Sequence, residues 1–547
     1  MWKTSKGYRL ILSVATICGI IQICVRFAFV WLCKELVDIA TGKADGSSYR
    51  MTIFCILMVT CIIVQALLSG LNSYITTTAE AKMKNSLQYI LFDKVMGCRW
   101  TGVEKFHTGD AINRIEEDVR VVCSTLCSSV PNMICNIAQA VGAFIYLFIL
   151  SPVLSIMIAG ILPAALILAK LLGRKLKHMT KNIRDTDSRI QALMQESLQK
   201  RLLLLCLLHT DNCIKTLKHM QKELLELVIR RNKFTVRSRF LITLGFGIGY
   251  ATTFIWSVFQ IKNGEVTFGM MTAFLQLIGL LQRPVAEFSR LVPGFINAIA
   301  SVERIKEFEV LEKENCKYID SAIYEMNNKN LCGVRLKNLT FKYPDGNRDI
   351  IQDISYDFKP GTITAIIGPT GSGKSSLIKL ILGVLSPNSG HVCIYDSHGH
   401  EFEASVSTRS EILYVPQGNS IMSGTVRSNL LKGNINVGNI TDENIRKALY
   451  TSAAEFVYDL PKGINTICGE NGIGLSEGQA QRISIARALL CKGNIILLDE
   501  FSSALDEKTE KIILERLQKN IEGKTIITVT HRQEVSSICN NILSLTS

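Results

Sequence analysis

Long, mostly uncharged stretches alternate with charged segments over roughly the first 300 residues of the chain. A membrane-spanning helix takes about 20 predominantly apolar residues. Five stretches are at least that long, at 10–33, 51–79, 121–169, 240–261 and 266–300. The third has about twice the length of one span, and Ser151-Pro152 in its middle predicts a turn that divides it. The pattern therefore predicts six membrane-spanning helices.

Basic residues are concentrated in some of the segments around these stretches and not in others. The N-terminus and the segments 82–120 and 170–239 are rich in Lys and Arg, whereas the remaining loops are short. Cytosolic loops of membrane proteins carry the excess of Lys and Arg. Both termini and the two long basic segments are therefore predicted to lie in the cytosol, with helices that continue beyond the bilayer.

Charged residues are frequent and evenly spread from about Glu303 to the end of the 547-residue chain, as in a soluble domain. We predict a transmembrane domain at 1–310, a linker at 311–332 and a cytosolic domain at 333–547. The net charge is +14, and most of it lies in loops between apolar runs, which favours membrane topology over nucleic-acid binding. The 17 cysteines are scattered without zinc-type spacing and are interpreted as reduced, mostly apolar side chains.

A complete phosphate-binding loop is present at 368–375, with the sequence Gly-Pro-Thr-Gly-Ser-Gly-Lys-Ser. It follows a strand-like run at 362–367 and opens a helical run that ends near Gly383, which is the context the motif requires. The glycines allow backbone N–H groups to surround phosphates, and the helix N-terminus adds positive potential. Lys374 is predicted to reach the β- and γ-phosphates, and Ser375 to bind Mg²⁺.

A second motif supplies acidic groups. The apolar run 495–498 reads as a buried parallel strand, and Asp499 and Glu500 follow it directly. Asp499 is predicted to hold Mg²⁺ and Glu500 to polarise the attacking water. Together with the phosphate-binding loop, this pair predicts an ATPase.

The segment Leu475-Ser-Glu-Gly-Gln479 resembles the signature of ABC ATPases, which other phosphate-loop ATPases lack. Further family motifs occur in the expected order, at Tyr343, Gln417, Gly469-Glu470, Ser503 to Asp506, and His531. In the membrane half, 266–270, Arg283-Pro284 and 301–305 resemble the sixth helix and exit of exporter half-subunits. The resemblance covers nearly the whole chain.

The resemblance implies a membrane α-helical bundle of six transmembrane helices, joined to a cytosolic α/β ABC-type ATPase domain. It implies ATP-driven export of a lipid, a peptide or an amphipathic small molecule by a dimer of half-transporters, with ATP and Mg²⁺ as cofactors. The catalytic residues implied are Glu500, His531 and Gln417. Mg²⁺ is assigned to Ser375, Gln417 and Asp499. ATP is assigned to Tyr343, Gly368, Pro369, Thr370, Gly371, Ser372, Gly373, Lys374, Ser375, Ser376, Ser476, Gly478, Gln479 and Asp506.

One residue departs from the family pattern. Glu477 stands where the usual signature has glycine, and a carboxylate aimed at the γ-phosphate would oppose closure. A Glu in the first turn of a helix is otherwise favourable, and we expect the site to be competent. An ATP-gated channel or a membrane-bound ABC regulator without transport remains an alternative reading.

The cargo is not evident from the sequence. Charged residues within spans are costly and often functional, and Arg26, Arg283 and Glu287 are candidates for cargo contact. Alternatively, Arg283 pairs with Glu287 along one helix, or Arg26 bonds to a neighbouring helix. Because no leader rich in Arg and Ser is seen, we expect a bacterial inner membrane. The partner, identical or related, is a second half-transporter.

Overall fold

The structure is a computed structural model in which the chain forms two compact units. The first unit comprises residues 1–95 and 107–310, and the second comprises residues 96–106 and 311–547. The described residues are 6–43, 48–100, 106, 108–314, 332–343, 346, 348–433, 440–469, 474–501, 504–520, 523–530 and 539–545.

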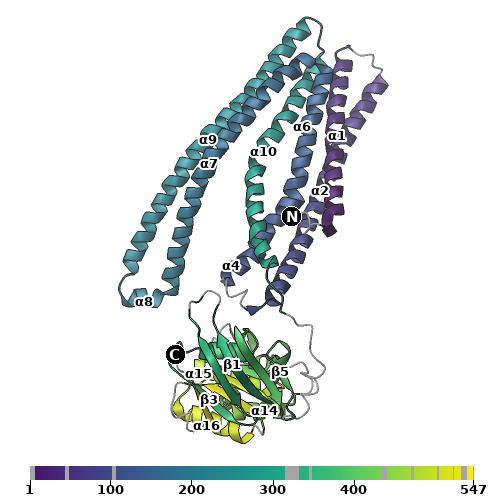
Figure 1. Cartoon of the computed structure of the whole chain (residues 1–547). Coiled ribbons are helices and arrows are strands. Elements are labelled where there is room, and N and C mark those ends of the chain that lie inside the picture. The colour runs from purple at the N-terminus through teal and green to yellow at the C-terminus, as the bar shows by residue number, and fades with distance from the viewer. Residues whose placement is uncertain are drawn as a thin grey trace. The chain divides into compact units, whose positions relative to one another are not determined.

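Long helices make up the first unit (Figure 1). Two π-helical turns, at Arg114–Asp118 and Thr125–Ser129, join three shorter helices into one run at 109–150. The helices are α1 (Arg9–Ala40), α2 (Ser48–Met96), α4 (Thr108–Asn113), α5 (Val119–Ser124), α6 (Val130–Leu150), α7 (Pro152–Gln199), α8 (Arg201–Cys206), α9 (Thr210–Lys262) and α10 (Phe268–Glu309). Figure 1 shows α7 and α9 running side by side, with α8 at their turn.

Each of the six predicted spans falls on these helices, and the sixth begins at Phe268, two residues after its predicted start. The turn predicted at Ser151-Pro152 is confirmed, because α6 ends at Leu150 and α7 begins at Pro152. Ser151 adopts an extended conformation there and its Oγ accepts a hydrogen bond from the Leu154 N–H at 3.4 Å, which caps α7. Among the described residues, α1, α2, the run 109–150 and α9 are long and apolar enough to cross a membrane.

The core of the first unit lies where α1, α6 and α10 meet. Its buried apolar side chains are Val30, Ala143, Leu147, Leu154, Val266, Ala273, Phe274, Leu277, Ile278 and Leu281. Many other apolar side chains of these helices are exposed, as expected for surfaces that face lipid. At the cytosolic end, buried Asp118 accepts hydrogen bonds from Ser301 Oγ and Arg304 Nε, both at 2.8 Å, which attach the 114–118 turn to α10.

The second unit is built on two sheets. The antiparallel sheet has the order β2-β1-β4-β5 and consists of β1 (Cys332–Phe341), β2 (Ile351–Phe358), β4 (Ser389–Asp396) and β5 (Glu401–Glu403). The parallel sheet has the order β11-β3-β10-β9-β6 and consists of β3 (Ile363–Ile367), β6 (Ile412–Val415), β9 (Ile495–Asp499), β10 (Thr525–Val529) and β11 (Asn541–Ser544).

Helices cover the parallel sheet, and its central strands are buried along their whole length. This explains why β9 and β10 read as unbroken apolar runs rather than alternating ones. The helices are α12 (Lys374–Ile381), α13 (Val426–Leu431), α14 (Asp442–Thr451), α15 (Glu477–Leu490) and α16 (Glu507–Asn520), and a short ribbon pairs β7 (Gly424–Thr425) with β8 (Ile467–Cys468). Because the strands are parallel, all their carboxyl ends lie on one edge of the sheet.

The first residues of the predicted linker are held by a short backbone joint in the second unit. The Arg99 N–H donates to the Glu312 carbonyl at 3.1 Å, and the Glu314 N–H donates to the Gly97 carbonyl at 2.9 Å. The Glu314 carboxylate receives two hydrogen bonds from Arg409, at 3.0 and 2.5 Å. Arg409 in turn donates from Nε to the Leu382 carbonyl at 2.8 Å, just after α12.

Candidate functional site

The phosphate-binding loop connects β3 to α12 at the carboxyl edge of the parallel sheet. Gly371 and Gly373 have φ values of 88° and 90°, which only glycine adopts without strain. A Cβ on Gly368 would lie 2.7 Å from the Leu545 carbonyl, so this position also has no room for a side chain. The loop is therefore shaped by its glycines, as the motif predicts.

Lys374 is buried at the first position of α12, and its side chain lies inside the curve of this loop. Its ammonium group donates to the carbonyl oxygens of Gly368 and Pro369, at 2.9 and 2.8 Å. These bonds hold the cation in the middle of the loop, where a phosphate oxygen can replace the carbonyls as acceptor.

Two serines follow Lys374 and differ in exposure. Ser375 is exposed and Ser376 is buried. The Ser376 hydroxyl lies 3.3 Å from the Tyr343 hydroxyl, which ties this aromatic residue to α12. Tyr343 also packs edge-on against Phe341, with ring centroids 4.9 Å apart. The Tyr343 ring is thus held in place by Phe341 and by Ser376, as a platform for a base requires.

Asp499 ends the buried strand β9, on the same edge as the loop. Its Oδ2 accepts a hydrogen bond from the Tyr414 hydroxyl at 3.3 Å, whereas its buried Oδ1 has no partner in the structure. Burial raises the pKa of Asp499, and the neighbouring carboxylate of Glu500 raises it further. A buried carboxylate oxygen without a donor is what a cation would satisfy.

The donor set fits Mg²⁺. Hydroxyl, amide and carboxylate oxygens from Ser375, Gln417 and Asp499 are hard ligands of the kind that Mg²⁺ accepts beside phosphates and water. Within the described ranges, no group of three or more His, Cys, Asp or Glu side chains could hold a metal ion.

Glu500 and Gln417 face each other across neighbouring strands. Gln417 follows β6 and Glu500 follows β9, and the Gln417 Nε2 donates to Glu500 Oε2 at 2.6 Å. Glu500 has a φ of 44°, a conformation uncommon outside glycine that turns the chain sharply after the strand. Such strain often marks functional positions, and here it brings the carboxylate to the edge of the sheet.

The signature segment begins α15. The Ser476 hydroxyl accepts from the Gln479 N–H at 3.2 Å, and the Gln479 side-chain oxygen accepts from the Ser476 N–H at 2.9 Å. This capping box fixes the start of the helix. Ser476 is exposed there, whereas Gln479 is occupied by its bond to Ser476.

Family models match both halves of the chain. Residues 12–285 match the ABC transporter transmembrane region, and residues 351–503 match the ABC transporter domain. The second match includes the phosphate-binding loop, Gln417, the signature and the Asp499–Glu500 pair described above. The chain belongs to the ABC transporter family. It is a membrane-spanning ABC exporter in which nucleotide binding and hydrolysis drive export across a membrane.

Relatives align over most of the chain. A mouse protein named "ATP-binding cassette sub-family B member 10, mitochondrial" is 28% identical over 519 residues, which cover 91% of this chain and 70% of the relative. An "ATP-dependent lipid A-core flippase" from Photorhabdus laumondii is 26% identical and covers 99% of this chain and 92% of its own length. A bacterial Atm1-family ABC exporter with ATP bound has a similar fold, with a TM-score of 0.79, 19% identity, and coverage of 98% and 93% of the two chains.

Glu477 is the first residue of α15 and is exposed. The neighbouring Gly478 is required by packing, because a Cβ there would lie 2.6 Å from the Ala504 carbonyl. Gly478 therefore sets how closely the ABC signature approaches the 504–506 segment. At the end of that segment, the exposed Asp506 accepts a hydrogen bond from the Thr509 N–H at 3.1 Å. The hydrogen bond from the Thr509 side chain, and next the one from its N–H, lower the pKa of Asp506.

Three residues matched to the family lie outside the described residues, namely His531, Ser503 and Glu470. Their assigned roles stay predictions. The strand β10, which leads to His531, does end at the same sheet edge as the phosphate-binding loop.

Tyr414 lies beside Asp499 in the site and was not predicted from the sequence. It lies in β6, three residues before Gln417, and donates to Asp499 from the neighbouring strand. Burial raises the pKa of the Tyr414 phenol, and the proximity of the Asp499 carboxylate raises it further. A tyrosine in an otherwise apolar strand, just before the Pro-Gln of this motif, was the available signal.

Proposed function

We propose that two copies of this chain form a homodimeric ATP-driven exporter, and that MgATP is hydrolysed at the carboxyl edge of the parallel sheet. The observation that carries this proposal is the 2.6 Å hydrogen bond between Gln417 and Glu500 beside the phosphate-binding loop. It supports a general base and an amide sensor on adjacent strands, next to the residues that would hold the nucleotide.

ATP binding would require Lys374 to change partners. Its ammonium group now donates to two loop carbonyls, and the β- and γ-phosphate oxygens would take their place. Backbone N–H groups at the start of α12 would complete the phosphate contacts, with Ser375 and Ser376 hydroxyls beside them. The ring of Tyr343 would stack on adenine.

Hydrolysis would require Glu500 and Gln417 to separate. In their bonded state, Gln417 occupies an oxygen of the Glu500 carboxylate. Once Gln417 turns to the nucleotide, the Glu500 carboxylate can accept a hydrogen bond from water and orient it for attack. Ser375, Gln417 and Asp499 would hold Mg²⁺, which supplies charge neutralisation at the phosphates. His531 is assigned to the γ-phosphate by its match to the family.

The second chain would contribute the ABC signature. The start of α15 contains Ser476, Gly478 and Gln479, and Ser476 is exposed there. The positive end of this helix favours an anion. We assign this surface, with Asp506, to the ATP held by the partner copy. Glu477 is compatible with this arrangement because its side chain is exposed at the first turn.

Replacement of Ser476 by arginine tests the shared site. In full-length protein in lipid nanodiscs, we expect Ser476→Arg to lower hydrolysis about a hundredfold, since a contact to the developing charge is lost. Binding of ATP should persist because the phosphate-binding loop is unchanged. Ser476→Thr keeps the helix cap, and Ser397→Arg places the same charge at an exposed turn; both should stay near the wild-type rate.

Hydrolysis by Ser476→Arg at the wild-type rate would contradict the shared site. If the wild-type chain binds ATP but does not hydrolyse it alone, either a related half-transporter is the missing partner or Glu477 disables the signature. Restoration of glycine at position 477 then separates a missing partner from a signature disabled by Glu477.

We place the exporter in a bacterial inner membrane, which the full-length similarity to a bacterial flippase supports. The mouse relative is named as mitochondrial, so membrane fractionation of the source cell is the direct test. Enrichment with an organelle membrane would overturn this placement. A lipid, a peptide or an amphipathic small molecule is the cargo class that we infer for the membrane half.

A further inference from the structure

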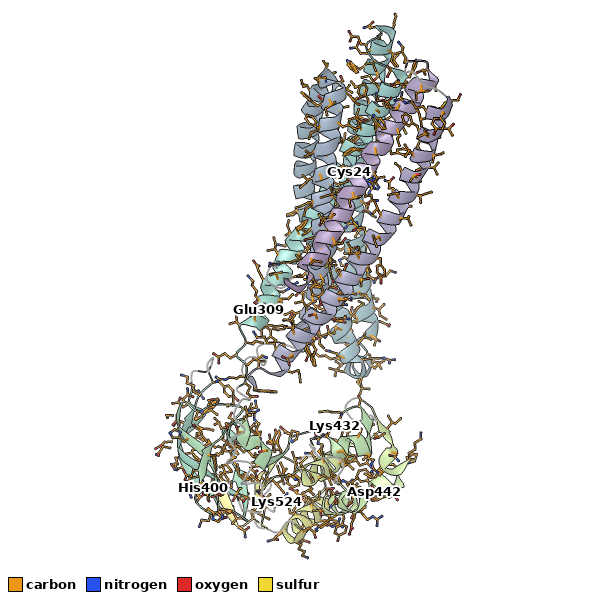
Figure 2. The ribbon with its side chains drawn as sticks, turned by 90° about the vertical axis from the view of Figure 1, so that its right-hand side faces the viewer. Cys24, Glu309, His400, Lys432, Asp442 and Lys524 are labelled. Atoms are coloured by element: carbon orange, nitrogen blue, oxygen red, sulfur yellow. The ribbon has the colours of Figure 1, made fainter. Side chains whose placement is uncertain are left out.

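Two arginines of the first unit lie at the same level of the helix bundle, as the register of α1 and α10 shows. The Gly269 N–H donates to Asp38 Oδ1 at 2.9 Å, which joins the end of α1 to the start of α10. The two helices are antiparallel, so both extend to the same side of this contact. With a rise of 1.5 Å per residue, Arg26 lies about 18 Å along α1 and Arg283 about 21 Å along α10. Figure 2 labels Cys24, two residues from Arg26 on α1.

Gln139 fixes Arg26 beside α10. This glutamine is buried on α6, and its Oε1 accepts a hydrogen bond from Arg26 Nη1 at 3.0 Å. Its Nε2 donates to the Leu280 carbonyl of α10 at 3.0 Å. Arg283 follows Leu280 by one turn of the same helix. Arg26, Gln139 and Arg283 therefore converge from three helices, and the expectation that Arg26 bonds to a neighbouring helix is confirmed.

The charge of this arginine pair is not neutralised within the described residues. No ion pair of Arg26 or of Arg283 is observed there, and the predicted Arg283–Glu287 pair is not among the observed ones. Gln139 satisfies one N–H of Arg26 but carries no charge. The arrangement is therefore costly without an anion.

Arg283 is the accessible member of the pair. Its side chain is exposed, whereas Arg26 is half-buried against Gln139. An arginine at this depth of an apolar helix faces a polar cavity in preference to lipid chains, because contact with the hydrocarbon costs several kcal/mol. One guanidinium group held by Gln139 and one exposed, at the same level of the bundle, can together receive a planar or tetrahedral oxyanion.

We propose that Arg26 and Arg283 bind the anionic headgroup, a phosphate or a carboxylate, of an amphipathic molecule carried by the exporter. The surrounding apolar helix faces would receive its hydrocarbon part. This proposal deepens the proposed function, since it names the class of cargo for the same transport cycle.

Equilibrium binding without nucleotide tests the arginine pair directly. Radiolabelled dodecyl phosphate is titrated into the full chain in phosphatidylcholine nanodiscs. We expect Arg26→Gln/Arg283→Gln to weaken binding about tenfold or more, because charge-assisted hydrogen bonds are lost. Arg26→Lys/Arg283→Lys should keep most of the affinity. Arg230→Gln, at an exposed position of α9, is the matched control and should bind as the wild type does.

Competitors define the chemistry of the ligand. Dodecanoate should displace the probe, whereas dodecyltrimethylammonium, with a similar chain and the opposite charge, should not. Inorganic phosphate should compete far more weakly than dodecyl phosphate. Equal competition by inorganic phosphate, or by the cationic amphiphile, would overturn the proposal.

An unchanged affinity in the double glutamine variant would also overturn it. If that variant does not fold, as judged by its elution and melting, Arg283→Gln alone carries the test, since this side chain is exposed. ATP hydrolysis is measured on the same wild-type sample. Arginine-dependent binding without hydrolysis contradicts the proposed function and leaves the arginine pair intact, whereas hydrolysis with arginine-independent binding contradicts the pair alone.

Discussion

The two units of this exporter use polar residues in opposite ways. In the ATPase unit, polar side chains gather at one sheet edge, where Gln417 contacts Glu500 and Tyr414 contacts Asp499. In the membrane unit the described polar contacts lie far apart along the helices, with that of Asp118 at the cytosolic end and that of Gln139 in the apolar region.

This difference reflects what each unit does. Phosphate chemistry is the same in every ATP molecule, so its ligands occur in contiguous motifs with fixed spacing. Cargo chemistry varies between exporters, and the contacts are spread over separate helices. The ATPase unit therefore identifies the reaction, and the membrane unit holds the information on specificity.

The buried ion pair of the membrane unit gives the largest expected change in stability. Removal of Arg304 leaves the buried Asp118 carboxylate with Ser301 as its described partner. We expect Arg304→Ala to lower the free energy of unfolding by about 2 kcal/mol, below the value for a fully buried pair because half of the Arg304 side chain is exposed. Thermal melting in nanodiscs measures this. Arg304→Ala/Asp118→Asn should recover part of the loss, and a double variant less stable than the single one would contradict the assignment.

One glycine of each unit shows how the two units differ in packing at these positions. A Cβ on Gly478 would clash with the Ala504 carbonyl, whereas a Cβ on Gly109 meets nothing within 4 Å. We expect Gly478→Ala to cost about 1–3 kcal/mol of stability through overpacking, and Gly109→Ala to be neutral or stabilising by up to about 1 kcal/mol. Melting temperatures of the two variants, compared with wild type, check both. A larger loss of melting temperature for Gly109→Ala than for Gly478→Ala would show that α15 does not pack as described.

A buried acid away from the site should respond to pH. Burial raises the pKa of Glu411, although the hydrogen bond from Asn494 and the charge of Lys524, labelled in Figure 2, oppose this. The folded state thus holds this proton better than the unfolded chain. The cost of the ionised carboxylate is present above the folded pKa and is lost as pH falls through it.

Glu411→Gln should therefore raise stability by about 1 kcal/mol at pH 7.5 and give no gain below pH ~4, since the amide keeps the Asn494 bond without the charge. Melting curves at the two pH values, with exposed Glu515→Gln as control, measure the difference. A gain that is equal at both pH values would contradict the sign.

The sequence predicted those parts of the molecule in which neighbouring residues act together. The phosphate-binding loop and the Asp499–Glu500 pair are contiguous, and apolar runs delimit the membrane helices. The contact of Tyr414 with Asp499 could not be predicted, because it depends on β6 lying next to β9. The same holds for Gln139, whose two partners lie 113 and 141 residues away in sequence. Contacts between separate helices or strands depend on their rotation and order, which periodicity does not determine.

The role of Glu500 tests the account most directly. Hydrolysis of MgATP is measured for the full chain in nanodiscs, alongside Glu500→Gln and Glu515→Gln, an exposed glutamate of α16. Glu500→Gln preserves the size of the side chain and removes the base. We expect it to bind ATP as the wild type does and to lose hydrolysis by about a hundredfold or more, whereas Glu515→Gln keeps the wild-type rate. Hydrolysis by Glu500→Gln at the wild-type rate would contradict the site at the sheet edge.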